Sequence, residues 1–514
     1  MHTRLAVSAV YHGLFGMTSA YYLTVMTSLE AHVKQFANAS LHERYNRTVT
    51  EADVTLAWSL SQAMLSVGAV IGSFASRYIG ERFGRRATVM VFTNLLIVAA
   101  SVLMYTAERA NLFEGYMLGR LLSGCARTAQ WYTVTYMTEC TPASSRGFTS
   151  LVSVIGTRIW LIAACFLALP DALGTEQRWP LLCLLPIPFA LVHLSTTCLF
   201  PQSPKFLYIM RDNVDGARKA VRFYHGDDAD TERVLASFER ERKLQRTAGG
   251  RTASLCDVLR THHLRVPFLL CLTVSATPPL MGVSLAVHYS TGVMQSLGVT
   301  NAALFTAAVI NGPCLIVGTI SVLIVDRVGR RFCQLTGLAL GILGTLSLFT
   351  AGTLHRSEST AGIGAALSVV ALILIVNGVS LGPGHMHAIM PGELCPQTSR
   401  TITWNIATSC GWTNDAFVLV VYPQLHRIIG AAAVLPLTAM ATVAFTVLFM
   451  FLPETSGKSV DEVHLSASWV AVKRLEGSLE NDDMALKPLQ DTQTGNGEPG
   501  GVFLPLNGDK KELA

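Results

Sequence analysis

The sequence predicts an all-helical membrane protein with twelve transmembrane helices arranged as two six-helix halves. Half of the 514 residues are apolar and only 14% are charged, whereas an average soluble domain is about 25% charged. The apolar residues gather in blocks of about 20, the length of an α-helix that crosses the hydrocarbon of a bilayer, and polar signatures of the first half recur in the second. These features exclude a set of soluble domains and a disordered acidic chain. The net charge of +5 is too small to indicate nucleic-acid binding.

The apolar blocks also predict how the chain is divided. A polar stretch at 201–264 separates the two halves and is too charged to enter lipid, so we expect an N-terminal half over 1–200, a helical cytoplasmic linker over 201–264 and a C-terminal half over 265–452. The remaining 453–514 is polar and is predicted to be a mostly disordered cytoplasmic tail. The predicted spans lie at about 6–28, 56–78, 87–106, 116–138, 148–169, 180–200, 267–292, 303–325, 333–353, 364–391, 401–423 and 431–452.

Arginine in the breaks between these blocks predicts their orientation, because positively charged loops stay in the cytoplasm. The breaks after the second and eighth blocks are rich in arginine, whereas those after the third, fifth, ninth and eleventh carry one arginine each. Even-numbered breaks and both termini are therefore predicted to be cytoplasmic. Two sequons for N-glycosylation, at Asn38 and Asn46, lie in the first break, which the same rule places outside.

Three polar signatures of the first half reappear about 250 residues later, at the same place in the second half. Two halves of six helices with parallel topology are typical of transporters whose binding site lies near the midplane, between the halves. The repeated pairs are Glu81–Arg86 with Asp326–Arg331, Glu139–Arg146 with Glu393–Arg400, and Pro201–Ser203 with Pro453–Thr455.

The repeated acidic and arginine residues lie at the cytoplasmic ends of the predicted helices. Carboxylate–guanidinium pairs can hold that side closed, and they would break and form again as the halves rock. The alternative is that these residues only set topology and fix loops, but the duplicated spacing favours gating. The candidate gating residues are Arg82, Arg85, Arg86, Glu139, Arg146, Arg327, Arg330, Arg331, Glu393 and Arg400.

These motifs resemble the sugar-porter branch of the major facilitator superfamily, in particular the animal facilitative glucose and fructose transporters. The resemblance implies the major facilitator fold, alternating access, a central hexose site, a helical cytoplasmic linker and a location in the plasma membrane. The matching pieces are Glu81–Arg86, Gly119-Arg120, Glu139–Gly147, Pro201–Pro204, His288–Thr291, Asp326–Arg331, Gly382–Gly384, Glu393–Arg400 and Pro453–Gly457.

The positions at which this family holds sugar differ in this chain. The family's Gln-Gln pair in the seventh span is Pro278-Pro279 here, and the Asn that follows it is Ser284. An Asn that precedes Trp412 is replaced by Gly411. Each lost hydrogen bond costs roughly 0.5–1.5 kcal/mol, so we expect weaker binding of glucose. The proline pair also removes two backbone donors and should break the seventh helix.

Ionisable groups in the apolar blocks are candidates for a rebuilt site. An intramembrane charge indicates function, and the positive sum of Arg127, Arg158 and three histidines would suit an organic anion. The alternative is that the arginines pair with carbonyls or with Asp415, and that the histidines are satisfied core groups. The candidate substrate-binding residues are Ser284, His288, Tyr289, Asn311, His385, His387, Trp412 and Arg158.

The sequence therefore favours facilitative transport of a hexose by alternating access. Proton symporters of the family that it resembles use a carboxylate in the first span, and residues 1–29 of this chain contain no Asp and no Glu. The alternatives are transport of a polyol or an organic anion such as urate, and a non-transporting sugar sensor with the same fold. An enzyme is not expected, because the chain has no phosphate loop and no HExxH or GxSxG motif. We expect no cofactor, no metal and no nucleic acid; the expected partners are a small-molecule substrate and membrane lipid, and the chain is expected to act as a monomer.

Overall fold

The computed structural model describes residues 2–45, 48–142, 145–227, 230–247, 254–290, 312–355, 357, 359–458, 460 and 462–463. Residues Met1–Ala467 form one compact unit, and the second unit, Ser468–Ala514, lies outside the described residues. Every regular element within the described ranges is helical, which confirms the predicted all-helical class.

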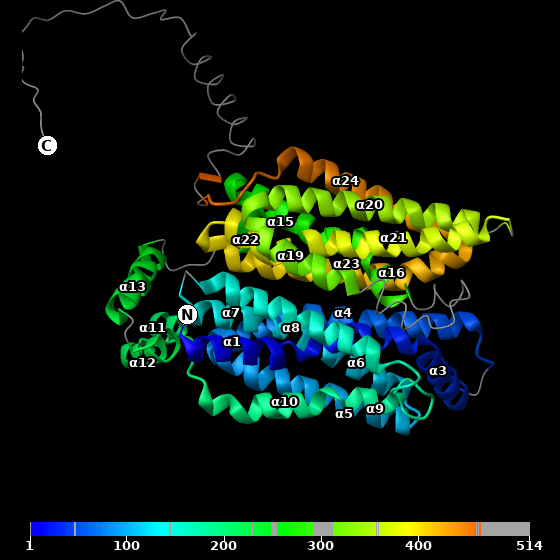
Figure 1. The fold of residues 1–514 in the computed structure, drawn as a ribbon, viewed down its shortest axis with the longest axis horizontal. Coiled ribbons are helices and arrows are strands. Elements are labelled where there is room, and N and C mark those ends of the chain that lie inside the picture. The colour runs from blue at the N-terminus through cyan, green and yellow to red at the C-terminus, as the bar shows by residue number, and fades with distance from the viewer. Residues whose placement is uncertain are drawn as a thin grey trace, which may run out of the picture. The chain divides into compact units, whose positions relative to one another are not determined.

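The first half gathers on one side of the compact unit (Figure 1). Its longest helix, α4, packs against α6, and α6 also packs against α5. Large aromatic side chains of this half, such as Trp58, Tyr21 and Tyr116, are fully buried. The α-helices of this half are α1 (Thr3–Phe15), α2 (Tyr21–Thr24), α3 (Glu30–Tyr45), α4 (Glu51–Arg82), α5 (Thr93–Arg109), α6 (Phe113–Ala129), α7 (Tyr132–Cys140), α8 (Arg146–Leu167), α9 (Trp179–Leu184) and α10 (Pro186–Ser195).

The second half forms the other side of the unit, and its helices run roughly along those of the first half (Figure 1). Helix α20 packs on α21 and α15 packs on α23, while α23 also packs on α4 of the first half. The elements of this half are α15 (His262–Leu280), α16 (Val283–His288), α19 (Gly312–Val328), α20 (Arg330–Leu354), α21 (Ala361–Leu381), α22 (Pro383–Leu394), α23 (Gln397–Ile429) and α24 (Leu435–Phe451).

Four short helices lie in the polar stretch between the halves. Side-chain caps explain where they begin: Ser203 accepts a hydrogen bond from the amide of Phe206, and Ser254 forms a capping box with Asp257. Their positions along the chain agree with the predicted helical linker, whose cytoplasmic location remains a prediction. These helices are α11 (Pro204–Ile209), α12 (Val214–His225), α13 (Thr231–Thr247) and α14 (Leu255–Arg260).

Within the described residues, 8 helices are long and apolar enough to cross a membrane. The predicted eleventh and twelfth spans both fall within one of these helices, Thr398–Phe451. The first, fourth and eighth predicted spans are not among them: α1 ends at Phe15, α6 gives way to α7 after Ala129, and the described part of the eighth span begins at Gly312. The 8 helices are Glu51–Arg82, Ala87–Arg109, Gly147–Leu167, Trp179–Leu199, His262–His288, Arg330–Leu354, Ala361–Leu394 and Thr398–Phe451.

The seventh predicted span is interrupted directly after its proline pair, as the sequence predicted. Helix α15 ends at Leu280, Gly282 adopts a φ of +81°, and α16 begins at Val283. Because Pro278 has no N–H, the carbonyl of Val274 loses its helical donor, and the hydroxyl of Thr277 donates to it instead over 2.7 Å.

Candidate functional site

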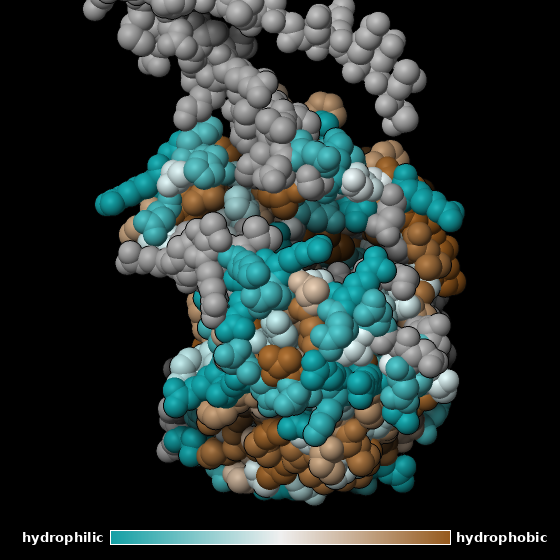
Figure 2. Space-filling view, turned by 90° about the vertical axis from the view of Figure 1, so that its left-hand side faces the viewer, coloured by the Kyte–Doolittle hydropathy of each residue, from teal (hydrophilic) through white to brown (hydrophobic). Residues whose placement is uncertain are grey.

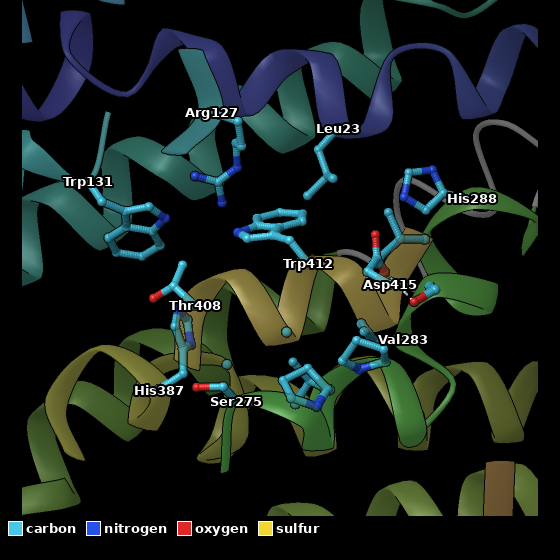
Figure 3. Close-up of a pocket in the computed structure, with 17 residues that line it drawn as sticks. Leu23, Arg127, Trp131, Ser275, Val283, His288, His387, Thr408, Trp412 and Asp415 are labelled. Atoms are coloured by element: carbon cyan, nitrogen blue, oxygen red, sulfur yellow. Dashed lines mark hydrogen bonds between the residues drawn. The ribbon is translucent and has the colours of Figure 1, made fainter. Parts of the chain in front are cut away.

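A cavity of about 200 Å³ lies between the two halves. Figure 3 shows the ring of Trp412 near its middle, with Arg127 and Trp131 toward one side and Asp415 and His288 toward the other. The lining residues come from both halves, and they are Leu23, Arg127, Trp131, Ser275, Pro278, Pro279, Val283, Ser284, Val287, His288, Val379, Gly384, His387, Thr408, Gly411, Trp412 and Asp415.

Helical spacing explains why these side chains share the cavity. On α23, the lining residues Thr408, Gly411, Trp412 and Asp415 follow at intervals of three, four and seven residues from the first, which is one face of an α-helix. Helix α15 supplies Ser275 and the proline pair by the same rule. After the break that follows Leu280, α16 contributes Ser284 and His288 to the same cavity wall.

Arg127 is the cationic group of the cavity wall. Its side chain is 7% exposed, and its Nε and Nη1 atoms are buried without a hydrogen-bond partner. The guanidinium carbon lies 5.5 Å from the centre of the Trp131 ring, in a cation–π contact. A buried guanidinium with two free donors is costly, so Arg127 is a candidate to bind an anionic or strongly accepting group.

Asp415 is the carboxylate of the same wall, and it joins the two halves. Its Oδ2 accepts a hydrogen bond of 2.5 Å from Ser66 on α4, and its Oδ1 accepts one from Ser284 on α16. The alternative in which Asp415 neutralises the intramembrane arginines is therefore not what the structure contains. Arg158 on α8 instead donates to Cys314 Sγ over 2.8 Å and to Ser380 Oγ over 3.3 Å.

The side chain of His288, which belongs to the second half, is positioned by a contact with the first half. Its Nδ1 lies 3.2 Å from Oε1 of Gln62 on α4, and the same oxygen accepts a hydrogen bond of 2.7 Å from Nη2 of Arg120. Arg120 is fully buried and also donates to the backbone carbonyl of Tyr22 over 2.7 Å. This chain of contacts fixes the ring of His288 at the edge of the cavity.

A cluster at one end of the first half contains several predicted gating residues. Arg85 Nε lies 3.3 Å from Glu139 Oε1, and the hydroxyl of Ser203 donates to Oε2 of the same carboxylate over 2.5 Å. Gln202 Oε1 accepts a hydrogen bond of 2.8 Å from the backbone amide of Arg86. The cluster therefore joins the end of α7 and the start of α11 to the helical turn at Arg85 and Arg86 that leads into α5.

The second half repeats this arrangement with one chemical difference. Arg330 lies 3.1 Å from Glu393 Oε1, and the hydroxyl of Thr455 donates to the other oxygen of Glu393. Glu454, which corresponds to Gln202, accepts hydrogen bonds from the amides of Arg330 and Arg331 over 2.8 and 3.1 Å. Each ion pair thus lies within one half and does not bridge the two halves.

The other predicted gating residues have different surroundings. Arg82 and Arg327 are exposed, and Arg400 donates to the carbonyl of Cys395 over 3.4 Å. The side chain of Arg146 lies outside what the structure describes. Figure 2 faces the end of the molecule at which α11 to α13 lie, and it shows hydrophilic side chains gathered over that end, with hydrophobic ones along its lower flank.

A family model described as "Sugar (and other) transporter" matches residues 7–466 of this chain. The chain belongs to this family. It is 30% identical over 451 residues to the solute carrier family 2, facilitated glucose transporter member 3 of Ovis aries, across 86% of this chain and 88% of that relative. It is 27% identical over 448 residues to member 5 of Equus caballus, with 86% and 88% covered.

Solved structures of sugar transporters share the fold. The partially occluded inward-open conformation of the xylose transporter XylE from E. coli matches with a TM-score of 0.71 at 17% identity, over 89% of this chain and 100% of that one. The proton:xylose symporter XylE of the major facilitator superfamily, bound to 6-bromo-6-deoxy-D-glucose, matches with a TM-score of 0.70 at 18% identity, over 90% and 98%. These structures agree with the predicted fold, and the family match above confirms the resemblance that the motifs indicate.

Four of the residues proposed from the sequence as substrate ligands of this sugar transporter lie together in the cavity wall. These are Ser284, His288, His387 and Trp412. They come from α16, α22 and α23, and the fold brings them together although more than 120 residues separate the first from the last. Whether they bind substrate remains a prediction.

The other proposed ligands lie elsewhere. The hydroxyl of Tyr289 donates to the carbonyl of Leu419 over 3.1 Å, and Arg158 is engaged by Cys314 and Ser380 as described above. His385 lines a second cavity of about 150 Å³, which shares Trp131 with the first. Asn311 lies outside the described residues.

The structure describes one of the two predicted glycosylation sites. Asn38 is exposed on α3, while the hydroxyl of Ser40, the last residue of its sequon, is buried and donates to the carbonyl of Asn111 over 2.7 Å. Asn46 lies outside the described residues, so both sites remain predictions.

Sequence reasoning did not propose Trp131, Ser275 or Thr408, and it considered Asp415 only as a partner of arginine. For Thr408 and Asp415 a signal existed, because both share a helical face with Trp412 at spacings of four and three residues. For Trp131 there was none, since its position depends on the end of α6 at Ala129 and the new start of α7 at Tyr132.

Proposed function

We propose that this member of the sugar transporter family carries a hexose-like sugar across the plasma membrane by facilitated diffusion, with the cavity around Trp412 as its substrate site. The observation that carries the proposal is that both halves line this cavity. A site between two halves can open to either side in turn as the halves rock. The relatives named above, described as facilitated glucose transporters, support the same assignment.

The lining offers the groups that a sugar needs. Asp415, Ser284 and Thr408 can hydrogen-bond hydroxyl groups, and the ring of Trp412 can pack on the apolar face of a pyranose. A small number of directed polar groups on a mostly apolar wall is typical of a small-molecule site. Together they would replace the amides that relatives use at the positions of Pro278 and Pro279.

The proposal includes twelve spans, with both termini in the cytoplasm and a monomer as the working unit. The clusters around Glu139 and Glu393 would then lie at the cytoplasmic face. Because each ion pair joins elements of one half, we propose that the clusters keep each half rigid at that face while the halves move against each other. A sensor without turnover would have less use for two such clusters.

Facilitated diffusion is favoured over proton coupling. The first 29 residues contain no acidic residue.

The experiment is uptake of radiolabelled D-glucose, D-fructose, a polyol and urate into proteoliposomes that contain the full chain, with and without an imposed pH gradient. We expect saturable uptake of a hexose that an inward proton gradient does not concentrate. Accumulation above the external concentration would contradict facilitated diffusion. Uptake of none of the four solutes by correctly inserted protein would favour the sensor.

A further inference from the structure

We propose that the cavity is adapted to a monoanionic sugar, a sugar acid such as a hexuronate, whose carboxylate binds Arg127. The inference rests on the proposed function and deepens it, because it names the substrate class of the same site. It starts from the two unpartnered donors of Arg127 in the cavity wall.

The charge of Arg127 calls for an anionic acceptor. Nε and Nη1 lie on different sides of the guanidinium, and a carboxylate forms a charge-assisted hydrogen bond with a guanidinium that is stronger than a bond between neutral groups. A sugar hydroxyl is a neutral acceptor and would leave the charge without a counter-ion. The carboxylate of Asp415 is occupied by Ser66 and Ser284, so the wall itself does not supply this partner.

The undescribed segment between α16 and α19, residues 291–311, contains no Asp and no Glu. Among the described residues, no ion pair or hydrogen bond joins Arg127 to an acidic side chain. We infer that its carboxylate partner comes from a solute. A lipid headgroup is not the expected partner, because Arg127 lies at the middle of the predicted fourth span, 11 residues from each end of 116–138.

The charges inside the bilayer lead to the same conclusion. Among the described residues, Arg158 has the neutral partners Cys314 and Ser380, Nε and Nη1 of Arg127 have none, and Asp415 is the single acidic residue of the cavity wall. The third buried arginine, Arg120, is satisfied by Gln62 and by backbone carbonyls. The net charge of these buried groups is positive. A bound monoanionic solute lowers the free-energy cost of keeping that charge in a medium of low dielectric constant.

The remainder of the cavity favours a sugar acid over a simple anion. Figure 3 shows Arg127 and Asp415 on opposite sides of the Trp412 ring. A carboxylate on Arg127 would place the polyhydroxy part of the solute over that ring and its far hydroxyls near Asp415. An inorganic anion would use Arg127 alone, and an aliphatic acid would leave a tail beside the charge of Asp415.

The test is exchange of labelled solutes by the full chain in proteoliposomes. D-Glucuronate is compared with D-glucuronamide, a neutral analogue of nearly the same shape, and with D-glucose. We expect wild-type protein to exchange glucuronate at least tenfold faster than glucuronamide at equal subsaturating concentrations. We expect Arg127→Gln to lower this ratio at least tenfold, Arg127→Lys to retain part of it, and Arg109→Gln, a change at an exposed arginine at the end of α5, to leave it unchanged.

Three outcomes overturn the proposal in distinguishable ways. If the protein exchanges glucose but does not prefer glucuronate over glucuronamide, the sugar-acid proposal is wrong and the proposed function stands. If the preference for glucuronate persists in Arg127→Gln, Arg127 is not the residue that binds the carboxylate. Exchange of none of the three solutes by inserted protein removes the proposed function together with the inference. If Arg127→Gln does not insert, the ratio measured for wild-type protein and for Arg127→Lys still decides.

Discussion

Ser66 on α4 donates a hydrogen bond of 2.5 Å to the carboxylate of Asp415 on α23, and this bond joins the two halves beside the cavity. Seven residues further along α4, Ser73 lies 2.9 Å from Ser409 on α23, oxygen to oxygen. The same pair of helices is thus joined once through a charged acceptor and once between neutral hydroxyls.

The two serines predict different costs of mutation. Hydrogen bonds to charged groups contribute about 1.5–3 kcal/mol, and neutral ones about 0.5–1.5 kcal/mol. We therefore expect Ser66→Ala to lower the thermal unfolding midpoint in detergent more than Ser73→Ala does. In a double-mutant cycle, Asp415→Asn should couple to Ser66→Ala and not to Ser73→Ala. Equal losses for the two serines, or no coupling to Asp415, would show that the charged contact does not stabilise this arrangement.

The ion pair between Arg330 and Glu393 predicts a loss of transport. Both side chains are mostly buried, with 13% and 24% exposed, and Thr455 also donates to Glu393. We expect Glu393→Gln to reduce the uptake rate at least tenfold while insertion and expression remain intact. The matched control is Glu81→Gln, because Glu81 is 48% exposed and pairs with Arg77 one turn away, a surface contact worth little. Unchanged uptake by Glu393→Gln would contradict the proposal that this cluster keeps its half rigid during transport.

The start of α20 predicts a different kind of defect. Glu454 accepts hydrogen bonds from the amides of Arg330 and Arg331, and a carboxylate at a helix N-terminus contributes about 0.3–2 kcal/mol. We expect Glu454→Gln to lower the thermal midpoint modestly, since one amide oxygen can replace one of the two carboxylate oxygens. In the first half, Gln202 already has this chemistry, so Gln202→Ala should cost less than Glu454→Ala. The reverse order would refute the capping role of Glu454.

Gly411 cannot be converted to the family's asparagine without cost. A Cβ atom at this position would lie 2.7 Å from the carbonyl oxygen of Ser275, the carbonyl that Pro279 leaves without its helical donor. We expect Gly411→Asn to destabilise the protein by about 1–3 kcal/mol and to move α23 away from α15. Gly392→Asn is the matched control, because nothing lies within 4 Å of a Cβ atom there. A Gly411→Asn variant as stable as this control would contradict the close approach.

The parts of the fold that could be predicted from the sequence are those that depend on local pattern. Apolar length predicted the helical class, and the proline pair predicted the interruption that follows Leu280, because a missing N–H acts on the helix that contains it. The ends of α1 and α6 were not predicted, since neither helix contains a proline and each lies within a block long enough to span a membrane. Their position depends on packing between helices.

The candidate site divides in the same way. Trp412 and His288 could be proposed because they stand in recognisable motifs, and Thr408 could have been added from its helical face. The partners could not be predicted. Nothing in the sequence indicates that Asp415 accepts hydrogen bonds from two serines while Arg127 pairs with none of the described acidic residues. The location of each arginine–glutamate pair within one half was not predictable either, because these contacts join residues that are far apart in the chain.

The measurement that tests the central claim most directly is equilibrium exchange of a labelled hexose by proteoliposomes containing wild-type protein, Trp412→Ala or Phe417→Ala. Trp412 lines the cavity, whereas Phe417, five residues later on α23, is 62% exposed on the surface of the helix bundle. If the cavity is the substrate site, exchange falls at least tenfold in Trp412→Ala and stays at the wild-type rate in Phe417→Ala. Equal exchange by all three proteins would contradict the assignment of this cavity as the site of transport.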